Sequence, residues 1–308
     1  MHSTLFDLTT RVTPLPLVTP NAPSDSQARE DRMPPASAGS DADVLPANSK
    51  AAPSNGVVPL PVIAAGPKSD TPAVRTPTPE ELEWLRESSN RLETASPREI
   101  IAWAAEHYQP KLGMATAFGP EGCVILHFLA EVAPQTYVFN LDTGYQFQET
   151  LDLRDRIAQR YGIEVELRRP RQTVEEYERL NGGPVYKTNP DRCCAERKLS
   201  VLHEASRELN AWMSGIRRDQ STDRARASIV GWDKKFGLVK ISPLANWTKQ
   251  QIWKLITDED IPYNPLHDQG YTSIGCFPCT RAVMFGEDER AGRWSGSAKT
   301  ECGLHSSD

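Results

Sequence analysis

Short apolar runs alternate with amphipathic stretches in the middle of the chain, and this alternation predicts strands followed by helices. Residues 113–118 form an apolar run typical of a buried strand, and residues 123–132 continue with a helical pattern. Residues 136–141 are rich in strand-forming types, and residues 146–161 and 164–168 predict a second helix and a third strand. This order predicts an α/β fold, in which a parallel twisted sheet is flanked by helices on both faces.

The flanking segments add further elements. Ser96, Pro97 and Glu99 predict a helix start, because Ser96 and Glu99 match a capping box and proline suits the first helical position. The loops at 119–122 and 142–144 follow predicted strands, so they lie at the strand carboxyl ends, where parallel sheets bind ligands. The remaining pattern predicts helices at 191–209 and 248–260, strands at 211–216 and 238–241, and loops after residue 261.

The first part of the chain lacks the pattern of a folded domain. Fourteen of the 25 prolines precede residue 80, and Phe6 is the only aromatic residue before Trp84. A stretch so rich in Pro, Ala, Ser and Asp cannot bury enough apolar area to offset the entropy of ordering it. Residues 1–78 are therefore predicted to be disordered, and residues 79–308 to form one folded domain.

Composition and charge narrow the partners of this domain. The formal net charge of −6 argues against general nucleic-acid binding, for which a basic surface is expected. No apolar run approaches the ~20 residues of a membrane span. Residues 1–20 lack the features of a secretory signal, and the acidic residues of the tail argue against a plastid transit peptide. We expect a cytoplasmic protein without a nucleic-acid or membrane partner.

Four cysteines in two close pairs are the main sign of chemistry. Cys193 and Cys194 are adjacent, and Cys276 and Cys279 bracket a Phe-Pro dipeptide. In a cytoplasmic protein such pairs bind metal or act catalytically more often than they form disulfides. Adjacent cysteines on a helix are awkward ligands for one ion, whereas an iron–sulfur cluster offers separate iron atoms to neighbouring sulfurs. The alternative is that some of these residues are small buried hydrophobic side chains.

Cys302 is a candidate nucleophile. It stands alone in a glycine-containing segment near the end of the chain, which also holds Lys299 and His305. A nearby cation lowers the pKa of a thiol and thereby raises its thiolate fraction. The alternative is an unimportant cysteine on a frayed tail.

Basic residues near predicted turns are candidate ligands for anions. Arginine binds phosphate or sulfate through paired hydrogen bonds, and backbone N–H groups at a helix start can hold the same groups. Lys198 lies four residues after Cys194 in the predicted helix, on the same face, where its charge would offset that of thiolates. The alternatives are exposed surface charges and a plain strand-to-helix turn. The candidates are Lys198, Arg217, Arg218, Arg290, Arg293 and the loop at 119–122.

Together these motifs resemble the assimilatory adenylyl-sulfate reductases of the phosphoadenylyl-sulfate reductase family, over roughly residues 95–308. The resemblance implies an adenine-nucleotide α-hydrolase-like fold with a modified PP-loop. It also implies one iron–sulfur (4Fe-4S) cluster per chain, held by Cys193, Cys194, Cys276 and Cys279. The motifs that carry the resemblance are Leu-Asp-Thr-Gly at 141–144, Cys-Cys-x-x-x-Lys at 193–198, Gly-Ile-Arg-Arg-Asp-Gln-Ser at 215–221, Cys-Phe-Pro-Cys at 276–279, Arg-Ala-Gly-Arg-Trp at 290–294 and Glu-Cys-Gly-Leu-His at 301–305.

The same resemblance implies the reaction. In this family the thiolate matching Cys302 attacks the sulfur of adenylyl sulfate, which releases AMP and leaves an S-sulfocysteine. Thioredoxin or glutaredoxin then releases sulfite. We therefore expect a mobile catalytic segment at about 287–308, a separate dithiol reductant and a homo-oligomer. The residues that the resemblance implies at the substrate are Thr116, Gly119, Leu141, Lys198, Arg217, Arg218, Arg290, Arg293 and His305.

The loop after the first predicted strand departs from the family pattern. Members often carry Ser-Phe-Ser-Gly-Ala-Glu-Asp there, whereas residues 116–122 read Thr-Ala-Phe-Gly-Pro-Glu-Gly. A hydroxyl and a carboxylate are thus partly lost, so backbone N–H groups are expected to do more of the binding.

Three other functions fit parts of the sequence. Reductases of 3′-phosphoadenylyl sulfate usually keep the terminal cysteine but lack the four cluster cysteines, so these favour adenylyl sulfate while dual specificity stays open. A PP-loop sulfur transferase acting on tRNA would need Ser-Gly-Gly-x-Asp-Ser near residue 116, which is absent. A non-catalytic iron–sulfur sensor of nucleotides has no need of Cys302 or of the arginine segment.

Overall fold

The computed structural model describes residues 74–297, 299 and 303, and every structural statement below concerns these residues. Most of the predicted disordered tail falls outside them, as do Cys302 and His305. The first helix, α1 (Pro79–Arg91), is capped by the side chain of Thr78. The sequence pattern did not predict α1, because only three of its residues are buried, and two of those are the serines at 88 and 89.

Six strands form one sheet in the order β3-β2-β1-β4-β6-β5. Every neighbouring pair is parallel except β5 with β6, which is antiparallel. The predicted parallel sheet is therefore confirmed, with an antiparallel edge strand, β5, that the sequence pattern did not predict. The strands are β1 (Leu112–Thr116), β2 (Tyr137–Leu141), β3 (Val165–Arg168), β4 (Ala211–Met213), β5 (Val230–Asp233) and β6 (Leu238–Ile241).

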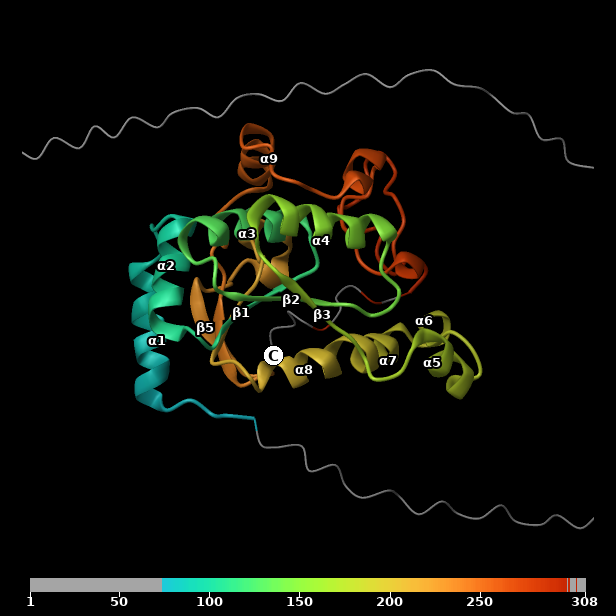
Figure 1. Cartoon of the computed structure of the whole chain (residues 1–308), viewed down its shortest axis with the longest axis horizontal. Helices are drawn as coiled ribbons and strands as arrows, with labels where there is room; N and C mark the ends of the chain where they lie inside the picture. The colour runs from blue at the N-terminus through green and yellow to red at the C-terminus, as the bar shows by residue number, and fades with distance from the viewer. Residues whose placement is uncertain (1–73, 298, 300–302, 304–308) are drawn as a thin grey trace, which may run out of the picture. The chain divides into compact units, whose positions relative to one another are not determined.

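Helices cover both faces of the sheet, as expected from its sequence (Figure 1). The green helices α3 and α4 lie along one face, and the yellow helices α7 and α8 lie along the other. The predicted capping box of α2 is present, because Ser96 Oγ accepts a bond from Glu99 N and the Glu99 carboxylate accepts one from Ser96 N. The remaining helices are α2 (Pro97–Tyr108), α3 (Pro120–Val132), α4 (Gln148–Tyr161), α5 (Val174–Asn181), α6 (Val185–Thr188), α7 (Pro190–Cys194), α8 (Ser200–Ser206) and α9 (Lys249–Asp258).

The helix predicted at 191–209 is not one regular α-helix. It consists of α7, a π-helical turn η1 (Ala195–Leu199) and α8. A π-turn has a wider hydrogen-bond spacing than an α-helix and often lies at a functional site. The α-helical spacing that predicted Lys198 on the same face as Cys194 therefore does not apply to this segment.

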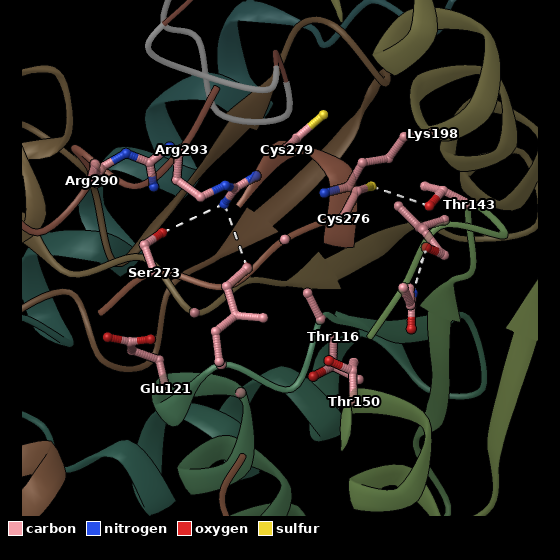
Figure 2. A pocket seen from close by; sticks show the side chains of 18 of the residues that line it. Thr116, Glu121, Thr143, Thr150, Lys198, Ser273, Cys276, Cys279, Arg290 and Arg293 are labelled. Carbon is pink, nitrogen blue, oxygen red and sulfur yellow. Dashed lines mark hydrogen bonds between the residues drawn. The ribbon is translucent and has the colours of Figure 1, made fainter. Parts of the chain in front are cut away.

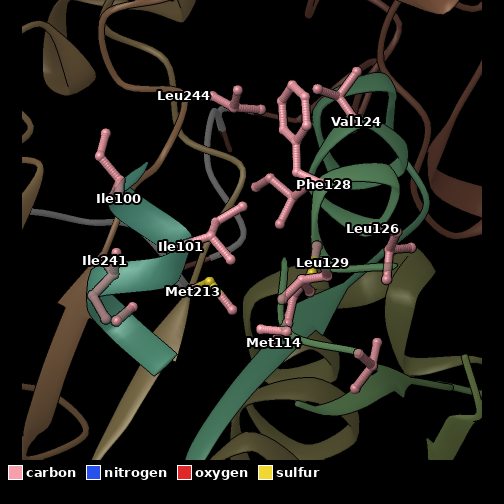
Figure 3. Packing of buried hydrophobic residues seen from close by; sticks show 14 of the residues in the cluster. Ile100, Ile101, Met114, Val124, Leu126, Phe128, Leu129, Met213, Ile241 and Leu244 are labelled. Atoms are coloured by element: carbon pink, nitrogen blue, oxygen red, sulfur yellow. The ribbon is translucent and has the colours of Figure 1, made fainter. Parts of the chain in front are cut away.

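Two apolar cores hold the sheet between its helix layers. Figure 3 shows the larger one, in which Ile101 of α2, Met114 of β1 and Leu129 of α3 are fully buried. The smaller core joins the other face to α8, through Phe139 and Trp212 of the strands. Because both faces are packed, the carboxyl ends of the strands are held rigidly.

The last part of the described chain is irregular, as predicted. After residue 261 the description contains only two short turns of 3-10 helix, at Pro265–Gln269 and Phe277–Cys279. A membrane-spanning helix is not found among the described residues, since none of their helices is both long and apolar enough.

Candidate active site

A cavity lies beyond the carboxyl ends of β1, β2 and β4 (Figure 2). The loop between β1 and α3 forms one wall, with Thr116 and Glu121, while Arg290 and Arg293 lie across from it. This is the edge of the sheet at which the sequence placed the ligand-binding turns.

The β1–α3 loop lines this cavity with Thr116, Gly119 and Glu121. Thr116 Oγ1 accepts a bond of 3.0 Å from Phe118 N, and Gly119 caps α3 without a side-chain bond. A Cβ added at Gly122 would lie 2.7 Å from Thr116 Oγ1, so the threonine hydroxyl fills the space of a side chain at 122. A side chain at position 122 would therefore require Thr116 to move.

The β1 and β2 ends are tied together by an amide network. Asn140 Nδ2 donates to Thr116 O at 2.8 Å. Gln146 Nε2 donates to Asn140 Oδ1 at 2.7 Å and to Leu141 O at 3.0 Å. Gln146 Oε1 is buried without a hydrogen-bond partner. This network fixes the walls on which Thr116 and Leu141 face the cavity.

All four paired cysteines line the same cavity. The pKa of Cys193 is raised to about 12, mainly by burial and in addition by the nearby thiols of Cys194, Cys276 and Cys279. Burial also raises the pKa of Cys279 to about 11, with further contributions from Cys276 and Cys194, while Arg293 opposes the rise. These effects between the thiols show that the two pairs, far apart in sequence, lie near one another.

The cysteine donors match a sulfur-ligated cluster in type and number. No three Cys, His, Asp or Glu side chains among the described residues are grouped closely enough to hold a single metal ion. The donor set instead comprises four thiols around one cavity wall, which is the ligand chemistry of a 4Fe-4S cluster. The ligand roles remain a prediction from the sequence.

The π-turn between α7 and α8 brings two cations toward this wall. Lys198 lines the cavity, although the spacing used to predict it was wrong. Its neighbour Arg197, which the sequence analysis did not single out, is only 3% exposed. Arg197 Nε donates to Thr143 O at 2.7 Å and its Nη atoms donate to Gln172 O at 3.3 Å. Arg197 therefore holds the loop after β2 against the cysteine helix.

The segment that carries Arg290 and Arg293 forms the wall opposite the β1–α3 loop. Arg293 Nη1 lies 3.5 Å from Ser273 Oγ and from Ile274 O, and its guanidinium lies 4.3 Å from the ring centre of Trp294. Arg293 Nε is buried without a hydrogen-bond partner. Arg290 also lines the cavity. Two arginines thus face the wall that carries Thr116 and Gly119.

Arg217 and Arg218 are adjacent but do not share a role. Arg217 is 3% exposed, lines the cavity and is paired with Glu121 and Asp219. Arg218 does not line the cavity, contrary to the prediction. Its guanidinium instead contacts Glu93, Asn246 Oδ1 and the carbonyl oxygen of residue 227, so it joins the α1–α2 connection to later loops.

The structure therefore brings most of the predicted site residues together. Cys302 and His305 lie outside the described residues, and Arg218 lies away from the cavity. The cavity also includes Gln220, which the motif at 215–221 contains, and polar residues that no motif marks in the sequence, namely Gln146, Ser214, Arg224, Lys249, His267 and Glu289. The predicted residues that line it are Thr116, Gly119, Leu141, Cys193, Cys194, Lys198, Arg217, Cys276, Cys279, Arg290 and Arg293.

Comparison with known proteins is consistent with this geometry. Two curated relatives are similar over most of their length. One, from Bacillus pumilus, is named adenosine 5′-phosphosulfate reductase and is 46% identical over 67% of this chain and 89% of its own. The other, from Gloeobacter violaceus, is named phosphoadenosine 5′-phosphosulfate reductase and is 44% identical over 72% of this chain and 93% of its own.

A solved structure and a family model cover the same part of the chain. The crystal structure of phosphoadenylyl-sulfate reductase from Candida auris, as a phosphate complex, matches with a TM-score of 0.59 and 29% identity. The match covers 68% of this chain and all of that one. The model of the phosphoadenosine phosphosulfate reductase domain matches residues 111–282, which is more than half of the chain. On these grounds the chain belongs to the phosphoadenosine phosphosulfate reductase domain family.

Proposed function

We propose that this oxidoreductase converts adenylyl sulfate to sulfite and AMP in assimilatory sulfate reduction. Several bacterial relatives that are 41% to 46% identical are named adenosine 5′-phosphosulfate reductase. The observation that carries the choice of adenylyl sulfate is the set of four cysteines, Cys193, Cys194, Cys276 and Cys279, around one cavity lined by cations. The resemblance associates this cysteine set with the unphosphorylated substrate.

The four cysteines would hold a 4Fe-4S cluster, one per chain. When bound, the cluster would tune the substrate site electrostatically. Lys198 and Arg293 are cations that line the same cavity and would offset the negative charge of thiolate ligands. Arg197 would keep the loop of Thr143 against the ligand turn.

The cations would also prepare the substrate for attack. Negative oxygens around a sulfate sulfur repel a thiolate, so fixed positive charge must offset them in the transition state. Arg290, Arg293 and Lys198 are among the cations that line the cavity, and they would supply this charge. Thr116, Gly119 and Leu141 would hold the nucleotide on the opposite wall.

Cys302 would act as the nucleophile. Its thiolate attacks sulfur, the bond from sulfur to the bridging oxygen breaks, and AMP leaves with that oxygen. A dithiol protein such as thioredoxin or glutaredoxin then attacks the S-sulfocysteine, releases sulfite and restores the Cys302 thiol, while its own dithiol becomes a disulfide. The expected cytoplasmic location and the homo-oligomer belong to the same proposal.

A reductase of 3′-phosphoadenylyl sulfate is the second candidate. It is favoured by the name of the Gloeobacter violaceus relative. The test is sulfite release by anaerobically purified protein, with both nucleotides side by side and thioredoxin as reductant. Activity on adenylyl sulfate alone, by brown protein with about four irons per chain, would support the proposal. Activity on the phosphorylated substrate would move the protein to the second candidate or to dual use, and silence on both would overturn the proposal.

A further inference from the structure

Arg217 is a buried cation that is paired with two carboxylates. Its side chain is 3% exposed. The Nε atom donates to Asp219 Oδ1 at 2.8 Å, and Nη1 contacts Glu121. One guanidinium with two carboxylates carries a net negative charge, which is an unusual arrangement for an arginine that faces an anion-binding cavity.

The two carboxylates differ in how firmly they are held. Asp219 also accepts a bond of 2.9 Å from Lys249 N, the first backbone amide of α9, so it is fixed from two sides. Glu121 instead lies in the first turn of α3 and lines the cavity, whereas Asp219 does not line it. Figure 2 shows it at the start of this helix, across the cavity from Arg290. Glu121 is therefore the carboxylate that a ligand can reach and replace.

An unpaired hydrogen-bond donor, Ser214, lines the same cavity as Glu121. Ser214 is 2% exposed, lines the cavity, and its Oγ has no hydrogen-bond partner. The next residue, Gly215, is so close to α3 that an added Cβ would lie 3.0 Å from Glu121 Cβ and 3.5 Å from Gly122 N. The first turn of α3 has no side-chain cap. Ser214, Glu121 and Arg217 thus all line the cavity, and the segment of Gly215 that joins Ser214 to Arg217 packs on the first turn of α3.

We infer that the Glu121 carboxylate occupies an oxyanion subsite on Arg217 while the cavity is empty, and that an oxyanion of the ligand displaces it. The ligand is a phosphate or sulfate oxyanion, either free or carried by a nucleotide. In the empty cavity Glu121 keeps a buried guanidinium paired, which avoids the cost of an unpaired buried charge. When the ligand binds, its oxyanion takes over Nη1 of Arg217, and Ser214 Oγ gains the partner it lacks. Glu121 thus competes with the ligand for Arg217 and lowers the affinity of the cavity for anions.

The choice of a nucleotide oxyanion as the natural ligand rests on the proposed function, but the subsite is measured without turnover. The test is calorimetric titration of the full chain with inorganic phosphate and, separately, with AMP. Glu121→Gln should bind phosphate about tenfold more tightly, a change of about 1.4 kcal/mol, because phosphate no longer has to displace a charged carboxylate from a buried guanidinium. A similar gain with AMP would assign the subsite to the nucleotide phosphate, whereas a gain confined to free phosphate would assign it to an anion other than that phosphate.

Two further variants keep the inference falsifiable. Ser214→Ala removes a hydroxyl that has no partner in the empty cavity, so the melting temperature should be unchanged or higher while phosphate binds several-fold more weakly. Glu289→Gln is the matched control, because Glu289 is also a cavity carboxylate but pairs with Lys249 rather than Arg217. Equal gains in Glu121→Gln and Glu289→Gln would overturn the inference in favour of a general charge effect. Weaker or unchanged phosphate binding in Glu121→Gln would show that Glu121 only orients Arg217. If the phosphate titrations gave the expected results but the protein formed no sulfite, only the proposed function would be contradicted.

Discussion

The hydroxyl oxygen of Thr143 lies 3.2 Å from the sulfur of Cys276. Thr143 belongs to the loop after β2, and Cys276 lies 133 residues further along the chain. Phe277 N donates to Tyr145 O at 2.7 Å beside this contact. The carboxyl edge of the sheet and the Cys-Phe-Pro-Cys turn are therefore held together by direct bonds, so that a change in either should affect both.

Removal of one ligand sulfur should remove the cluster. Cys276→Ser, produced and purified anaerobically, should lose most of its iron and its brown absorption, because the cluster would keep only three thiolate ligands. Iron and sulfide analysis measures this. Cys123→Ala is the matched control, since Cys123 is fully buried and does not line the cavity. Full iron content in Cys276→Ser would show that Cys276 is not a ligand.

Replacement of the terminal cysteine should separate binding from chemistry. Cys302→Ser should lose sulfite formation while it retains iron and nucleotide binding, because a serine hydroxyl is a far weaker nucleophile than a thiolate. Mass spectrometry after incubation with adenylyl sulfate and no reductant should find an added sulfite group on the native chain and none on the variant. Continued sulfite production by Cys302→Ser would assign the nucleophile to another residue.

Arg293 and Arg218 should give opposite phenotypes. Arg293→Ala should lower kcat/KM about 100-fold to 1,000-fold, as expected when a donor to developing negative charge is lost. Arg218→Ala should leave kcat/KM nearly unchanged and lower the free energy of unfolding by about 1 kcal/mol, because it loses the ion pair with Glu93. Steady-state kinetics and urea unfolding measure the two effects. A large kinetic loss in Arg218→Ala would contradict the placement of this side chain away from the cavity.

Mild acid should destabilise the folded chain. Burial lowers the pKa of His127, His203 and His267 below their ordinary value. The unfolded chain therefore binds protons at about pH 6.5, where these folded-state histidines remain neutral. Their stabilising effect is complete above that pH and is lost as the pH falls toward the folded-state values. The melting temperature should thus drop between about pH 7.5 and about pH 5.5, and the drop should be smaller in His127→Gln. A melting temperature that is constant or rises over this interval would be the opposite result.

Local patterns were sufficient for the first half of the sheet. The strands β1, β2 and β3 are short apolar or β-rich runs with turn residues at their ends, and α3 and α4 show helical periodicity between them. The edge strand β5 was missed because only its first and last residues are buried, which leaves a weak signal. The π-turn was missed because no residue type marks it, although it decides where Arg197 and Lys198 lie.

The sequence by itself determined the chemical groups of this protein: two cysteine pairs, a terminal cysteine and clustered arginines. The tertiary structure decided which of them share a cavity. Arg217 has an extended backbone, whereas Arg218 begins the 3-10 turn Arg218–Gln220. Arg217 therefore faces the cavity with Glu121, while Arg218 turns outward to Glu93, 125 residues away in the chain. A motif records that two arginines are adjacent, but only the folded backbone and its distant carboxylates determine the direction of each.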